Sequence, residues 1–199
     1  MTDRKYPFPS REDALLILQR DYCYKKIPEQ EVQSLIDMSW QLGVDAARKF
    51  LDKFPLSEPL KFDLILAGEG FTVKTKDMDY VSGNIRYFAE IQPGSKMVTV
   101  YKQSVQMWAK KNGCSYRQAR NLILMHEYFH YLEMTELGLV SKRYQVYMIK
   151  IFGKKIGKTG IAALSEIAAN GFARTIFPYA LFEGEGELRK GTQADETTV

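Results

Sequence analysis

The two histidines of this sequence stand four residues apart, in the string His126-Glu127-Tyr128-Phe129-His130. On a helix, residues at this spacing share one face, so both imidazoles can bind a single metal ion. Glu127 can then accept a proton from a water molecule at that metal. The string therefore predicts a helix, a metal site and a general base together. Two ordinary helix histidines with satisfied hydrogen bonds are the alternative interpretation.

The remaining composition is that of an ordinary globular chain. Of its 199 residues, 45% are hydrophobic and 26% are charged, which suits one domain with a buried core. The net charge of +4 is mild, so direct nucleic-acid binding is not expected. Cys23 and Cys114 match no metal-ligand spacing and predict free thiols, which favours the cytoplasm. We find no secretory signal and no apolar stretch of membrane-spanning length, so no membrane partner is expected.

Hydrophobic periodicity predicts an α+β chain in three parts. Residues 1–27 are expected to form an N-terminal helical appendage, residues 28–182 the main domain, and the polar residues 183–199 a disordered tail. Strand-like segments joined by short links predict a small three-stranded antiparallel sheet, packed on a helical bundle. The expected strands are 71–75, 80–91 and 97–101, and the expected helices of the main domain are 28–53, 58–67, 104–112, 115–137, 141–152 and 160–176.

A catalytic zinc ion usually has three protein ligands and one open position, and the sequence has no third histidine. Glu136 stands where a longer histidine motif places its third ligand, but Glu133 replaces the glycine that this motif needs. Glu133 lies about 10 Å along the helix from His126, so we interpret both glutamates as solvent-exposed or secondary groups. Glu166, in an alanine-rich helix, is the preferred third ligand. Asn170, one turn later, is expected to accept the free ring N–H of one histidine.

A helix with H-E-x-x-H and a later helix with Glu166 resemble the gluzincin arrangement, and the chain resembles the ImmA/IrrE family of bacterial and phage metallopeptidases. The matching segments are 59–67, 70–73, 81–85, 97–101, 117–125 and 166–173. The chain departs from the family at Phe129, where glycine is common, and in a long stretch between His130 and Glu166. The resemblance implies a zincin-like fold, zinc on His126, His130 and Glu166, and a cytoplasmic peptidase. Members cut a transcriptional repressor, often on a mobile element.

The expected reaction is hydrolysis of a peptide bond in a protein substrate, with Glu127 as general base. Its transition state needs an oxyanion stabiliser. The candidates are Tyr144, Tyr147, Tyr179 and Arg174. Segment 97–101 is interpreted either as an edge strand that binds an extended substrate or as a plain core strand. The alternative function is a regulatory protein that keeps the fold and the metal without proteolysis.

The segment before Glu166 is basic. No Asp or Glu lies between Leu137 and Ser165, whereas six Lys or Arg residues lie within 142–158. A solvated charged surface is the commoner interpretation of such a run. A patch that attracts an acidic partner or DNA is the alternative.

Overall fold

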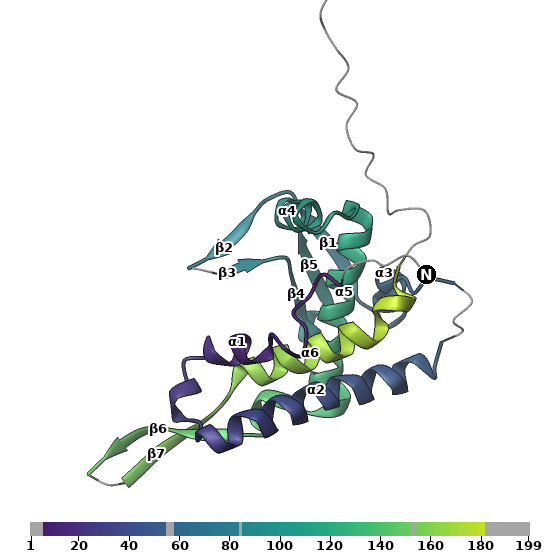
Figure 1. Cartoon of the computed structure of the whole chain (residues 1–199). Helices are drawn as coiled ribbons and strands as arrows, with labels where there is room; N and C mark the ends of the chain where they lie inside the picture. The colour runs from purple at the N-terminus through teal and green to yellow at the C-terminus, as the bar shows by residue number, and fades with distance from the viewer. Residues whose placement is uncertain (1–5, 55–57, 84, 153, 182–199) are drawn as a thin grey trace, which may run out of the picture.

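The computed structural model describes residues 6–54, 58–83, 85–152 and 154–181 (Figure 1). Its elements form the α+β architecture that the sequence predicts. The α-helices are α1 (Ala14–Gln19), α2 (Glu29–Leu51), α3 (Phe62–Gly68), α4 (Lys102–Asn112), α5 (Tyr116–Leu132) and α6 (Ala162–Ile176). The strands are β1 (Thr72–Lys76), β2 (Tyr80–Ser82), β3 (Ile85–Tyr87), β4 (Ala89–Gln92), β5 (Met97–Tyr101), β6 (Gln145–Ile151) and β7 (Lys154–Gly160). None of the helices in these ranges is long and apolar enough to cross a membrane.

The main sheet is mixed, with the strand order β1-β5-β4. β5 pairs parallel with β1 and antiparallel with β4. The antiparallel sheet expected from the sequence is therefore wrong. Four of the five residues of β5 are buried, against one of four in β4. The more apolar strand, β5, takes the central position, as expected for strands buried on both faces. It lies between β4, which directly precedes it in the sequence, and β1.

Two further expectations about strands need correction. Of the two interpretations of segment 97–101, the substrate-binding edge is wrong and the plain core strand is confirmed, because the segment is the central strand β5; β4 is an edge strand that contacts α5. The single strand expected over 80–91 is divided into β2, β3 and β4. Gly83, with a φ of +58°, begins the turn between β2 and β3, which pair as a separate antiparallel hairpin.

The segment expected to be a helix over 141–152 is instead the first strand of a second hairpin, formed by β6 and β7. Val, Tyr and Ile recur along β6, and these residues favour a pleated backbone over a helix. The turn at Phe152 has a φ of +46°, and Gly157 has a φ of +66°. The hairpin extends away from the helices in Figure 1 and carries most of the basic run.

Helices α2 and α6 pack against each other at unusually short range. A Cβ built on Gly43 would lie 1.9 Å from the carbonyl oxygen of Ala168, and one built on Gly171 would lie 2.5 Å from that of Trp40. Because each glycine removes a side chain at the contact, the two backbones can approach this closely. The contact fixes where α6, and therefore Glu166, lies.

The N-terminal residues share the core of the main domain. Ala14, Leu18 and Cys23 are fully buried, and they belong to the same hydrophobic cluster as α5 and α6. The expected N-terminal helix is α1, although it begins only after Asp13, which accepts hydrogen bonds from the backbone N–H and hydroxyl of Ser10. Residues 1–5 and the tail predicted over 183–199 lie outside the described residues.

Candidate metal centre

Helix α5 carries the histidine string, as the sequence predicts. Ser115 caps its N-terminus by accepting a hydrogen bond from the backbone N–H of Gln118 at 3.1 Å. The last turn of the predicted helix, Glu133–Leu137, widens into a π-helix and ends at Gly138, whose φ is +73°. Such π segments often occur at functional sites.

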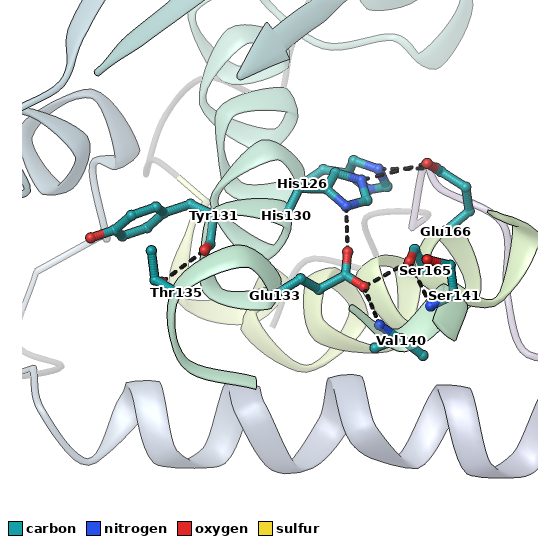
Figure 2. A network of polar contacts seen from close by, with 9 residues as sticks. All are labelled: His126, His130, Tyr131, Glu133, Thr135, Val140, Ser141, Ser165 and Glu166. Carbon is teal, nitrogen blue, oxygen red and sulfur yellow. Dashed lines mark hydrogen bonds and ion pairs between the residues drawn. The ribbon is translucent and has the colours of Figure 1, made fainter. Parts of the chain in front are cut away.

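Three potential ligands converge from α5 and α6 (Figure 2). The Nε2 atom of His126 lies 3.4 Å from Oε2 of Glu166, and Nε2 of His130 lies 3.5 Å from Oε1 of Glu166. One ligand atom from each residue lies within 4.8 Å of the others. Two ligands at about 2.1 Å from a tetrahedral zinc ion are about 3.4 Å apart. The nitrogen and oxygen donors therefore fit zinc in both chemistry and spacing.

The site is buried on the histidine side and open on the glutamate side. The side chains of His126 and His130 are 15% and 16% exposed, whereas that of Glu166 is 52% exposed. The partial loss of water around this half-exposed carboxyl would by itself raise the pKa of Glu166, but the hydrogen bond from His126 and the charges of both histidines lower it to about 2. The carboxylate is therefore ionised at neutral pH and ready to bind a cation.

Glu127 has a different environment from Glu166. Burial raises the pKa of its carboxyl, the charges of His130 and His126 lower it, and the charges of Glu166 and Glu90 raise it again, with a net shift upward. A carboxylate with a raised pKa is a stronger base than an ordinary surface glutamate, which suits proton transfer.

The buried group that orients His130 is Glu133, which is 2% exposed. Its Oε2 atom lies 2.8 Å from Nδ1 of His130. Its Oε1 atom accepts hydrogen bonds from the backbone N–H of Val140 at 2.9 Å and the hydroxyl of Ser165 at 2.7 Å (Figure 2). A carboxylate at Nδ1 places the ring proton there and leaves Nε2 free to bind a metal. The sequence feature that could have indicated this contact is the position of Glu133 three residues after His130, which puts both side chains on one helix face.

Asn170 does not have the contact that the sequence predicted for it. It is 3% exposed, and its backbone carbonyl accepts a hydrogen bond from the hydroxyl of Tyr6 at 3.0 Å. In the described part of the chain, no hydrogen bond joins its side chain to His126 or His130. Nδ1 of His126 is buried there without a hydrogen-bond partner. Glu133 therefore occupies the position at His130 that was expected of Asn170.

The four candidate oxyanion stabilisers have other partners. Burial and the neighbouring Glu31 carboxylate raise the pKa of Tyr144 to about 12. Tyr147, on β6, has the ammonium groups of Lys155 and Lys158 over its ring at 5.1 Å and 5.5 Å. The guanidinium of Arg174 lies over the ring of Tyr6 at 4.7 Å, and the backbone carbonyl of Tyr179 accepts a hydrogen bond from Leu60. Among the described residues, no hydrogen bond, ion pair or ring contact joins any of the four to the two histidines or to Glu166.

We compared the chain with protein-family models, with curated proteins and with solved structures. None of the three comparisons finds a match. The resemblance to the ImmA/IrrE family therefore stays a prediction, and the function has to be argued from the geometry of the site.

Proposed function

We propose that the protein is a zinc-dependent endopeptidase with a zincin-like fold. The observation that carries this proposal is the convergence of His126, His130 and Glu166 beside a glutamate, Glu127, whose pKa is raised. The arrangement of elements supports it as well, since the histidine-bearing helix α5 contacts strand β4 of the small sheet and α6 supplies the carboxylate. Each of these features is what a metal-dependent hydrolase needs.

The donor set favours a catalytic metal over a structural one. A structural zinc site usually closes all four positions with Cys or His ligands, whereas a catalytic site keeps one position open. Among the described residues, His126, His130 and Glu166 are the three that bring potential ligand atoms close enough together to hold one metal ion. When bound, a zinc ion supplies Lewis acidity, which polarises a carbonyl group and makes water more acidic.

Glu127 performs the proton transfers in the proposed reaction. Its carboxylate accepts the proton of the attacking water and then delivers it to the nitrogen of the leaving amine. Glu133 keeps the proton of His130 on Nδ1, so that Nε2 stays available as a ligand. Strand β4 is an edge strand beside α5, and an extended peptide can add to such an edge through backbone hydrogen bonds.

The proposed substrate is a regulatory protein of the cytoplasm, such as a transcriptional repressor. This part of the proposal rests on the resemblance to the ImmA/IrrE family. The two cysteines are free thiols, which agrees with a reducing compartment.

Incubation of the zinc-loaded protein with a mixture of peptides, followed by mass spectrometry, tests the proposed activity. We expect the wild-type protein to produce defined cleavage products and Glu127→Gln to produce none while it retains zinc. Cleavage by Glu127→Gln at the wild-type rate would contradict the role of Glu127. A wild-type protein that binds zinc but cleaves neither the peptides nor the repressor encoded nearest to it would favour the non-proteolytic regulatory alternative.

A further inference from the structure

The N-terminal segment Tyr6-Pro7-Phe8-Pro9 lies against the candidate metal centre. The ring of Phe8 is stacked on the imidazole of His126, with the ring centroids 5.7 Å apart and an interplanar angle of 9°. The Phe8 ring also contacts Trp108 of α4 at 5.3 Å. Figure 1 shows this segment, in purple, running past α5 and α6 before α1 begins. Phe8 therefore connects the imidazole to the indole ring of another helix.

The two histidines are held in different ways. His130 has the carboxylate of Glu133 at Nδ1. Nδ1 of His126 is buried and has no hydrogen-bond partner among the described residues. A histidine that binds a metal through Nε2 usually donates its other N–H to an acceptor, and this hydrogen bond sets the orientation of the ring. For His126, which lacks this hydrogen bond, the stacked ring of Phe8 is a contact that can set the plane of the imidazole.

Phe8 is itself held firmly by its neighbours in the segment. The hydroxyl of Tyr6 donates a hydrogen bond to the backbone carbonyl of Asn170 at 3.0 Å, and its ring meets Phe177 edge-on at 5.3 Å. The guanidinium of Arg174 covers the Tyr6 ring. Pro7 and Pro9 restrict the backbone on both sides of Phe8, which lowers the entropy lost when the segment is ordered. Tyr6 thus attaches the segment to α6, the helix that carries Glu166.

We infer that Phe8 is a positioning residue for the metal site, whose ring fixes the imidazole of His126 so that Nε2 faces Glu166. This inference rests on the proposed function, since it assumes that His126 binds a metal. On this inference, the N-terminal segment orients a metal ligand in addition to packing against the core. A residue that only fills space would be replaceable by any apolar side chain of similar size, whereas a positioning ring requires an aromatic face.

The test is cobalt(II) binding to the full-length protein. Cobalt accepts nitrogen and oxygen ligands of the same types as zinc, and its visible absorption reports the geometry of those ligands. The variants are Phe8→Ala, Phe8→Leu and Phe8→Tyr, with Tyr22→Phe as the control. Tyr22 is an exposed aromatic residue of the N-terminal part, and its hydroxyl shares a hydrogen bond with Thr159 of β7 rather than with a residue that holds Phe8. Circular dichroism and thermal unfolding of the metal-free variants identify any variant that fails to fold. If Phe8→Ala does not fold, Phe8→Leu decides the question.

We expect Phe8→Ala and Phe8→Leu to bind cobalt about threefold to tenfold more weakly than the wild type, because aromatic pairs contribute on this scale. Their cobalt spectra should shift, while Phe8→Tyr and Tyr22→Phe keep the wild-type spectrum. Wild-type affinity and spectrum in Phe8→Leu would overturn the inference and leave the metal site intact. A wild-type protein that binds no cobalt would overturn the metal site itself, and the role of Phe8 with it.

Discussion

Ser165 donates a hydrogen bond to Glu133 across the junction between α6 and the end of α5, at 2.7 Å. The same carboxylate contacts Nδ1 of His130, and Ser165 is the residue before Glu166. Ser165 also accepts a hydrogen bond from the backbone N–H of Ser141 at 3.1 Å. The buried carboxylate of Glu133 thus connects His130 on α5 to Ser165, the residue next to Glu166 on α6.

Replacing Glu133 should weaken metal binding without removing any ligand. Loss of a carboxylate that orients a ligating histidine typically lowers metal affinity about 10-fold to 100-fold, and we expect a decrease of this size for Glu133→Ala. Ser165→Ala should have a smaller effect in the same direction, because it removes only one hydrogen bond to that carboxylate. Competition with a zinc-binding dye measures both.

Glu136→Ala is the matched control for Glu133→Ala. Glu136 lies in the same π-helix, but its side chain is 56% exposed and its ion pair with Lys53, at 4.0 Å, is a weak surface contact. Zinc affinity should stay at the wild-type value in this variant. Equal losses of zinc affinity in Glu133→Ala and Glu136→Ala would mean that the π-helix as a whole, rather than the Glu133 carboxylate, supports the site.

The close approach of α2 and α6 predicts that Gly171→Ala is strongly destabilising. Its new methyl group would lie 2.5 Å from the backbone carbonyl oxygen of Trp40, so the helices must separate. Overpacking of this kind costs about 1–3 kcal/mol of unfolding free energy. Gly68→Ala is the control, because nothing lies within 4 Å of a Cβ at that position. Urea unfolding should separate the two variants, and equal midpoints would contradict the described contact.

Zinc binding should release protons at neutral pH. Burial lowers the pKa of His130, but Glu133 and the charges of Glu166 and Glu127 outweigh burial and raise it to about 9. His130 is therefore protonated in the zinc-free protein at pH 7.5, and a metal must displace that proton. Affinity for zinc should rise as the pH increases toward 9. Calorimetry in two buffers of different ionisation enthalpy measures the protons released, and identical heats in both buffers would contradict this prediction.

The same raised pKa predicts how the zinc-free protein responds to pH. Because the pKa of His130 is about 9 in the folded state and 6.5 in the unfolded reference, protonation of His130 stabilises the fold fully below pH 6.5. This contribution is lost as the pH rises through 9. Urea unfolding of the zinc-free protein at pH 6 and pH 9.5 should reveal the decrease. The decrease should be smaller in Glu133→Gln, since the ionised partner of His130 is then missing.

The sequence predicted those features that depend on local spacing. His126 and His130 are one helical turn apart, and the small residues around Glu166 favour close helix packing, so both ligand helices followed from pattern alone. Strand β5 followed from its β-branched residues. The hairpin of β6 and β7 did not, because its lysines and aliphatic residues fit both helical and strand periods. Strand order in the sheet is a tertiary property, which short links between strands do not determine.

The contacts that hold the histidines were the hardest part to predict. The role of Glu133 depends on the π-helix and on Ser165, which reaches it from a distant helix. The stacking of Phe8 on His126 joins residues that are far apart in the sequence, and no periodicity signals it. Asn170 has the right spacing on α6 for such a role, but it is Tyr6 that binds its backbone. Spacing along a helix predicts which residues share a face, not which partner each one meets.

Diffraction from crystals of the zinc-loaded protein, recorded on both sides of the zinc absorption edge, tests the central claim most directly. We predict one anomalous peak per chain, at about 2.0–2.2 Å from Nε2 of His126, Nε2 of His130 and a carboxylate oxygen of Glu166. The peak should persist in Glu127→Gln and disappear in His126→Ala. A zinc peak elsewhere, or no peak in the wild-type protein, would contradict the account.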